Sequence, residues 1–185
     1  MNKSVYLTLL LVIIFMLVIY LFRSEFFRIA PSTDLVTLSK RELRNSGIEA
    51  MKKGDDPISA IVLYNYTVIG RGYNTIESDT NAVGHAVINA INDAVKSMGW
   101  AQFRGLDRTG LIVMTTTEPC QLCVSVMQEY EIPKVEFMNR LPLDYWLKTY
   151  WDDIAFDFRK RQISPSDLQD SLYQLKSSYQ INSLP

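Results

Sequence analysis

Residues 115–123, Thr-Thr-Thr-Glu-Pro-Cys-Gln-Leu-Cys, constrain the fold of this 185-residue chain more than any other stretch. They follow a short apolar run at 111–114 and open an apolar-periodic run at 124–130, which predicts a strand that leads into a helix. Proline suits the first turn of a helix, because its missing N–H is not needed there. Cys120 and Cys123 then lie at positions i and i+3, so both thiols point to one side of the helix.

These two residues are the only cysteines in the sequence, and His85 is its only histidine. Both segments have the pattern of a helix N-terminus, where the macrodipole favours thiolate over thiol. One histidine and a Cys-x-x-Cys pair can supply three ligands to zinc and leave the fourth tetrahedral position for water, as in catalytic zinc sites. A thioredoxin-like redox pair is the alternative for a Cys-x-x-Cys between strand and helix.

The stretches His85-Ala-Val87 and Pro119-Cys-Gln-Leu-Cys123 resemble the zinc-dependent cytidine/deoxycytidylate deaminase superfamily, most closely its tRNA-adenosine and guanine deaminase branch. The signature of that superfamily is H-x-E followed by P-C-x-x-C. The resemblance implies that His85, Cys120 and Cys123 hold zinc. It also favours metal binding over a redox pair, because a redox pair would not explain the match around His85.

Val87 occupies the position at which the resemblance expects glutamate. In the family that glutamate is the proton shuttle and not a ligand. General acid–base catalysis contributes roughly 10²- to 10⁴-fold to a rate, and valine has no titratable group. We therefore predict a catalytically inactive, zinc-binding domain that acts as an accessory or interaction subunit of a membrane complex.

The alternative is an active deaminase of a nucleobase, nucleoside or nucleotide in which another acid replaces the missing one. Glu77 and Glu118 are the acids closest in sequence to the motifs. Asn74, in Arg71-Gly-Tyr-Asn74, resembles a family asparagine that commonly hydrogen-bonds substrate, and is a candidate pocket residue. Asparagine is equally a common turn residue.

The N-terminal part contains an 18-residue run without a charge, residues 5–22. As a helix it would span about 27 Å, close to the ~30 Å of the hydrocarbon layer. We expect a transmembrane anchor at 1–28, a linker at 29–38 and the deaminase-like domain at 39–185. A cleaved signal peptide is the alternative, but its apolar region is typically about 7–15 residues long.

The basic residues that follow this run predict a single-pass membrane protein whose C-terminal domain is cytoplasmic. Two cysteines in a ligand pattern fit a reducing compartment better than a disulfide framework. The net charge of −1 gives no support to nucleic acid as a partner. We expect membrane partners and leave a homodimer open.

The periodicity and turn signals predict the remaining elements. We expect helices at 39–53, 83–98, 119–130, 141–151 and 164–180, and strands at 58–64, 67–73, 111–116, 134–138 and 154–160. A helix, a hairpin and then helix–strand units predict a three-layer α/β/α domain on a five-stranded mixed sheet, as the family resemblance also implies.

Overall fold

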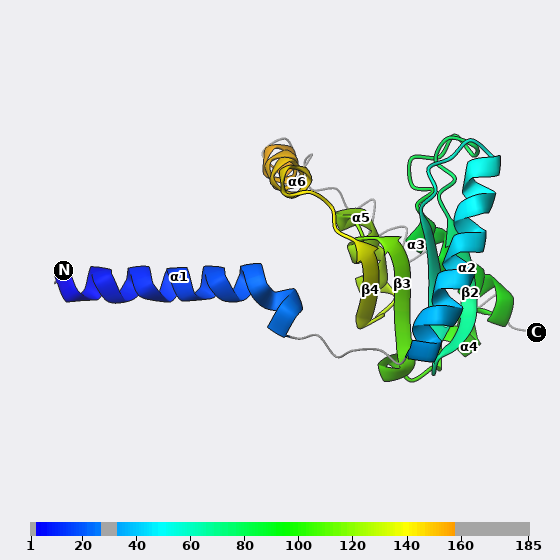
Figure 1. The fold of residues 1–185 in the computed structure, drawn as a ribbon, viewed down its shortest axis with the longest axis horizontal. Coiled ribbons are helices and arrows are strands. Elements are labelled where there is room, and N and C mark those ends of the chain that lie inside the picture. Colours follow the sequence, from blue (N-terminus) through cyan, green and yellow to red (C-terminus); the bar gives the residue numbers. More distant parts are fainter. Residues whose placement is uncertain (1–2, 27–32, 158–185) are drawn as a thin grey trace, which may run out of the picture. The chain divides into compact units, whose positions relative to one another are not determined.

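The structure is a computed structural model that describes residues 3–26 and 33–157. The chain divides into two compact units, Met1–Arg140 and Leu141–Pro185. The helices, drawn in Figure 1, are α1 (Lys3–Phe26), α2 (Thr33–Lys52), α3 (Ala86–Met98), α4 (Trp100–Arg104), the short 3-10 helix η1 (Arg108–Gly110), α5 (Gln121–Glu129) and α6 (Leu143–Asp157). The strands are β1 (Ser59–Tyr64), β2 (Thr67–Tyr73), β3 (Leu111–Thr117) and β4 (Lys134–Asn139).

The strands form one mixed sheet in the order β2-β1-β3-β4. Strand β1 pairs antiparallel with both β2 and β3, whereas β3 and β4 run parallel. A parallel pair needs a crossover connection, and α5 lies within the one that joins β3 to β4.

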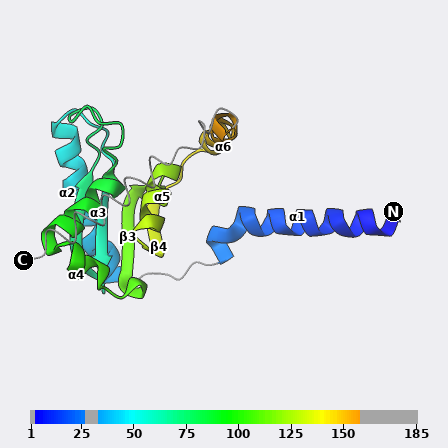
Figure 2. The same cartoon turned by 180° about the vertical axis from the view of Figure 1, so that it is seen from behind.

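Alternate residues of β1 face opposite sides of the sheet and belong to two separate cores. Ala60 and Val62 pack in a core shared with α3 and α5, while Ile61 and Leu63 pack in a second core with Leu43 of α2. Figure 1 shows the sheet from the α2 side, and Figure 2 shows the opposite face with α3 and α5. The described residues therefore form an α/β fold with a core on each face of the sheet.

Helix α3 packs unusually close to β2, because β2 carries two glycines on the face that it presents to α3. A Cβ atom added at Gly72 would lie 2.2 Å from the backbone nitrogen of Ala90 and 2.3 Å from the carbonyl oxygen of Ala86. A Cβ at Gly70 would lie 2.3 Å from the carbonyl oxygen of Ala90. No side chain fits at such distances, so these glycines allow the close approach of α3 to β2.

The predicted hairpin is confirmed, although its two-residue turn contains no glycine. Asn65 and Tyr66 both have positive φ, 46° and 66°. Positive φ at both central residues is the requirement of a type I′ turn, whose twist matches that of the flanking strands. Asparagine tolerates this conformation well, and Tyr66 adopts it at the exposed end of the hairpin.

The prediction of a fifth strand at 154–160 is wrong. Helix α6 continues through Asp157, so residues 154–157 are helical, and the sheet has four strands among the described residues. Tyr150 and Ile154 keep the four-residue spacing of a helix, which the short apolar run concealed. Residues 158–160 and the predicted closing helix at 164–180 lie outside the described residues.

Two further boundaries differ from the prediction. Helix α2 begins at Thr33, inside the predicted linker 29–38 and before the predicted start of this helix at 39, and Ser39 is buried within it. Between the predicted helix 83–98 and the predicted strand 111–116, where no element was expected, the structure has α4 and η1.

The prediction of a transmembrane anchor at 1–28 is also wrong. Residues 5–22 are helical as expected, within α1, but none of the helices in the described residues has both the length and the apolar character that crossing a membrane requires. The 18-residue run is at the lower limit of the roughly 17–25 residues that a span needs. The single-pass membrane location that was predicted from this run is therefore wrong as well. The described residues give no support to the predicted membrane partners.

Candidate metal centre

Two helix N-termini bring the predicted ligands together from distant parts of the sequence. His85 is the N-cap residue of α3 and Cys120 is the N-cap residue of α5, with Cys123 in the first turn of α5. Both helices pack on the same face of the sheet, and their first turns therefore meet. The close packing of α3 on β2 positions His85, and strand β3 leads the chain to Cys120.

The three donor atoms have the separations that a tetrahedral zinc ion requires. The Cys120 Sγ lies 3.3 Å from the His85 Nδ1 and 3.4 Å from the Cys123 Sγ, and the Cys123 Sγ lies 3.5 Å from the same Nδ1. Bonds of about 2.3 Å to sulfur and about 2.0–2.1 Å to nitrogen place tetrahedral ligands roughly 3.5–3.8 Å apart. A shift of a few tenths of an ångström accommodates the ion, so the predicted ligands fit zinc.

The two thiols share one hydrogen bond and therefore titrate very differently. That bond, with further support from the backbone of Cys123 and the charge of His85, lowers the pKa of Cys120 to about 5. The same bond, together with burial, raises the pKa of Cys123. At neutral pH, Cys120 is therefore a thiolate that can bind a metal ion, and Cys123 keeps its proton.

Val87 lies two residues after the histidine ligand, in the first turn of α3. Its side chain is 3% exposed and belongs to the core cluster that also contains Ala86 and Cys123. The structure therefore has an apolar side chain, packed into the core, at the position where the signature has a carboxylate.

The candidate replacement acids do not join the donor group. Among the described residues, the metal-binding side-chain atoms that lie within 4.8 Å of one another come from His85, Cys120 and Cys123, without a carboxylate. Glu77 is exposed, and Glu118 is half-buried, with its backbone N–H donating to the carbonyl oxygen of Asn139 at 2.7 Å. Neither one supplies an acid within this group.

Asn74 lies directly after β2, and its side chain is 5% exposed. Its backbone N–H donates to the carbonyl oxygen of Ile58 at 2.9 Å, which ties the end of β2 to the start of β1. Loop 75–84 then leads to His85. The role of Asn74 in a pocket stays a prediction.

Asn89 is a positioning residue that the sequence did not identify. Its Nδ2 donates to the carbonyl oxygens of Tyr73 at 2.8 Å and Gly84 at 3.3 Å, and to the Thr75 Oγ1 at 3.0 Å. It thereby joins the end of β2 to the residue before His85. Its position four residues after His85, one helical turn on, was the available signal.

Asp55 holds the other side of the same loop. The Asp55 Oδ1 accepts hydrogen bonds from the backbone N–H groups of Glu77 at 2.8 Å and Ser78 at 3.3 Å. The Ser78 hydroxyl and these N–H groups lower the pKa of Asp55. The carboxylate is separated from the loop by more than twenty residues, so sequence reasoning had no signal for it.

Comparison with known proteins supports the metal centre. Residues 36–139 match the model of the cytidine and deoxycytidylate deaminase zinc-binding region, which is more than half of the chain. The chain is 31% identical over 104 residues to a tRNA-specific adenosine deaminase of Streptococcus pyogenes, covering 56% of this chain and 62% of the relative. It is 26% identical over 111 residues to tRNA-specific adenosine deaminase 2 of Danio rerio, covering 58% and 50%. The chain thus spans about half to three fifths of these relatives.

Solved structures with the same fold include a guanine deaminase from Bacillus subtilis, with a TM-score of 0.55 and 16% identity over 76% of this chain and 93% of that one. A structure from a study of tRNA:A34 deaminases has a TM-score of 0.50 and 22% identity, and covers 57% of this chain and 78% of that one. At such identities these structures show the fold alone. Together with the family model and the three assembled donors, they establish that the chain belongs to the cytidine and deoxycytidylate deaminase family and contains its zinc-binding domain.

Proposed function

We propose that this protein is a zinc-binding member of the deaminase family that does not deaminate and instead acts through contacts with other proteins, as an accessory or interaction subunit. The observation that supports this proposal is the buried Val87 in place of the proton shuttle. Zinc would be retained by His85, Cys120 and Cys123, and would stabilise the fold, because metal binding to such sites is coupled to folding.

Hydrolytic deamination needs a group that carries protons to the ring nitrogen and to the departing amine. Zinc at this site would act as a Lewis acid and lower the pKa of a water molecule. The side chain of Val87 can neither hold nor release a proton. Without another acid in the donor group, we expect substrate to bind without turnover.

An active deaminase is the second candidate, and the complete ligand set favours it. The relatives named above are tRNA-specific adenosine deaminases. If activity exists, we expect Asn74 to contact the substrate and an acid from outside the donor group to approach on binding. A homodimer stays open, and the absence of a nucleic-acid partner stays a prediction.

The test is a deamination assay on zinc-loaded protein, in three forms: wild type, Val87→Glu and Val87→Gln. Substrates are cytosine, adenine and guanine as base, nucleoside and nucleotide, and a tRNA anticodon stem-loop with adenosine at the wobble position. We expect no wild-type ammonia release above a metal-free blank. Val87→Glu restores the signature and should gain activity, whereas Val87→Gln has nearly the same shape and should not.

Zinc content and thermal unfolding of each form show whether it is folded and loaded. Wild-type turnover that disappears in Cys123→Ala would refute the proposal and establish the active alternative. Loss of zinc from folded wild-type protein would show that the site itself is vestigial.

A further inference from the structure

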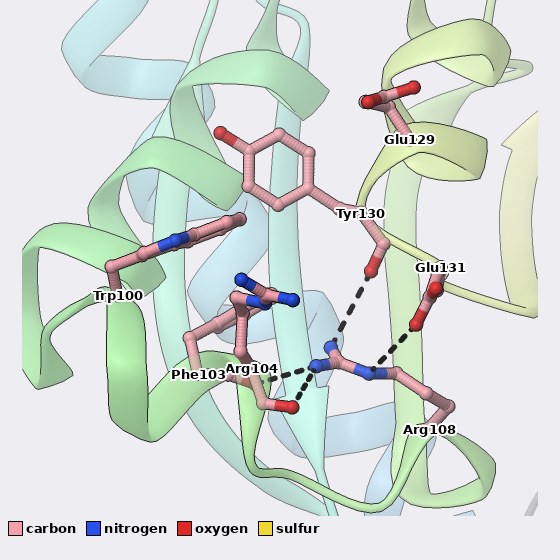
Figure 3. Close-up of a pocket in the computed structure, with 7 residues that line it drawn as sticks. All are labelled: Trp100, Phe103, Arg104, Arg108, Glu129, Tyr130 and Glu131. Carbon is pink, nitrogen blue, oxygen red and sulfur yellow. Dashed lines mark hydrogen bonds and ion pairs between the residues drawn. The ribbon is translucent and has the colours of Figure 1, made fainter. Parts of the chain in front are cut away.

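A second site lies at the opposite ends of the two helices that begin at the metal centre. A hollow of about 440 Å³ is lined by α4, by Arg108 of η1 and by residues 129–131 at the end of α5 (Figure 3). Helix α3 has 13 residues and α5 has nine, so at about 1.5 Å per residue the hollow is on the order of 15 Å from the donors. It is therefore separate from the metal centre.

Three aromatic rings form one wall of the hollow. The Tyr130 ring meets the Trp100 ring edge-to-face at 5.8 Å and the Phe103 ring at 5.9 Å. Phe103 is 1% exposed and anchors the group, whereas Trp100 is 52% exposed. The buried Phe103 thus supports this wall from the core side, and the Trp100 indole is exposed to solvent.

Arg108 holds the hollow together from below. One terminal nitrogen donates to the carbonyl oxygens of Phe103 at 2.9 Å and Arg104 at 2.7 Å, and the other donates to that of Tyr130 at 3.5 Å. Its Nε lies 3.6 Å from a carboxylate oxygen of Glu131. These contacts join the ends of α4 and α5, so the Arg108 guanidinium is already engaged within the chain.

Two charged side chains remain on the rim. Among the described residues, the Arg104 guanidinium has no hydrogen-bonding or ionic partner and lies over the Trp100 ring, 5.6 Å from its centroid. Glu129 is exposed and likewise has no such side-chain partner in the described part of the chain. Figure 3 shows the two charged groups on opposite sides of the Tyr130 ring.

We propose that this hollow is a docking site for a peptide segment of a partner protein that carries an acidic and a basic residue on either side of an apolar one. The acidic residue would pair with Arg104, the apolar side chain would pack on Trp100, and the basic residue would pair with Glu129. Exposed tryptophan, tyrosine and arginine are the residue types that dominate protein–protein binding energy. The inference deepens the proposed interaction role and rests on it.

The test starts from a random peptide library displayed on phage and selected against the zinc-loaded full chain. We expect enriched peptides to share the acidic–apolar–basic pattern. Arg104→Glu and Trp100→Ala should each weaken the best peptide about tenfold or more, the size expected for residues central to an interface. Hydrogen exchange of α4 and α5 shows whether each variant keeps the hollow.

Reversal of the charges makes the test specific. The double variant Arg104→Glu/Glu129→Lys should bind a peptide with its acidic and basic residues exchanged better than it binds the original. The matched control is Glu49→Lys/Lys52→Glu, which reverses the exposed 2.7 Å ion pair on α2 and should leave both affinities unchanged.

Three outcomes would overturn the inference. The first is that no peptide is enriched, and the second is that the affinity of the peptides does not change when the Arg104 charge is reversed. The third is that free tryptophan displaces the peptide, which would indicate a small-molecule site. The deamination assay is independent of these results. Wild-type turnover with intact peptide binding would refute only the proposed function, whereas an inactive protein without charge-patterned peptides would refute only this inference.

Discussion

Helices α3 and α5 have two ends with opposite properties. At their N-terminal ends, the donor atoms of one histidine and two cysteines lie within 3.5 Å of one another, and the neighbouring Val87 is part of the core. Cys123 is buried, whereas His85 and Cys120 are partly exposed. At the other ends, α4 and the last residues of α5 present an exposed indole and two charges without partners among the described residues. At the N-terminal ends, the donor group has the geometry to bind a metal but includes no carboxylate. At the opposite ends, charged side chains line an open hollow.

This difference teaches that the metal donors and the residue at the proton-shuttle position have different structural determinants. The donor positions depend on where two helices start, which the packing of the whole domain fixes. The proton shuttle depends on a single side chain, and that side chain can change without moving a helix. Variants that affect one end and spare the other should show how independent the two ends are.

The largest effect should follow removal of a ligand. Cys120→Ser should weaken zinc binding more than about 100-fold, since even changes to groups that only hydrogen-bond a ligand weaken it about 10- to 100-fold. The variant should also unfold at lower temperature when zinc is present. Competition with a chromophoric chelator measures the affinity, and Ser125→Ala on the exposed side of α5 is the control. Hydrogen exchange of α4 should not change; if it does, the two ends are coupled.

Gly72→Ala should have the next largest effect. Its new Cβ would lie 2.2 Å from the backbone nitrogen of Ala90, so α3 must move away from β2. Overpacking of this kind typically costs about 1–3 kcal/mol in the free energy of unfolding. Denaturant unfolding measures it. Gly105→Ala is the matched control, since its nearest contact would be an ordinary 3.5 Å. Equal destabilisation of both variants would contradict the close packing of β2 and α3.

Zinc affinity should rise with pH. Because the pKa of Cys120 is lowered to about 5, this ligand is already a thiolate near neutral pH. The pKa of Cys123 is raised, so metal binding must displace its proton. From about pH 7.5 to 9, affinity should therefore increase roughly tenfold per pH unit, with release of about one proton per zinc. Calorimetry in buffers of different ionisation enthalpy counts the protons. A count of zero or two would contradict a site with one thiolate and one protonated thiol.

Asn89→Ala should have the smallest effect, about 1 kcal/mol in the free energy of unfolding, the usual net contribution of a hydrogen bond. Loop 75–84 should exchange its amide hydrogens faster, since Asn89 joins the two ends of that loop. Asn92→Ala, at an exposed position of α3 one turn later, is the control. Unchanged amide exchange in loop 75–84 would show that Asn89 does not position this loop.

The sequence predicted most of the core elements because their signals are local. The hairpin, the helix after His85 and the strand before Cys120 each follow from apolar periodicity and turn residues within about ten positions. The ligand set followed from a short motif and from the scarcity of histidine and cysteine. Each of these required only residues that are neighbours in the chain.

The rest depended on contacts between distant residues or on marginal signals. Asp55 and loop 75–84 meet only after folding, so the sequence did not show the hydrogen bonds that Asp55 accepts from this loop. Arg108 and Tyr130 also meet only after folding, so the sequence did not show the hollow that they line. The run at 154–157 was too short to distinguish strand from helix. The run at 5–22 met only the lower limit of a membrane-spanning length, and that prediction was wrong.

The burial of Val87 has a consequence for how this domain can change over generations. A glutamate that arose there by mutation would place a carboxylate where the present side chain is 3% exposed, at a cost of several kcal/mol unless it ionises beside a metal or gains hydrogen bonds. Small domains are stable by only about 5–15 kcal/mol, so that single step would remove much of the margin. A change from valine to glutamate at this position is therefore best tolerated by a chain that already holds zinc or has gained stability elsewhere.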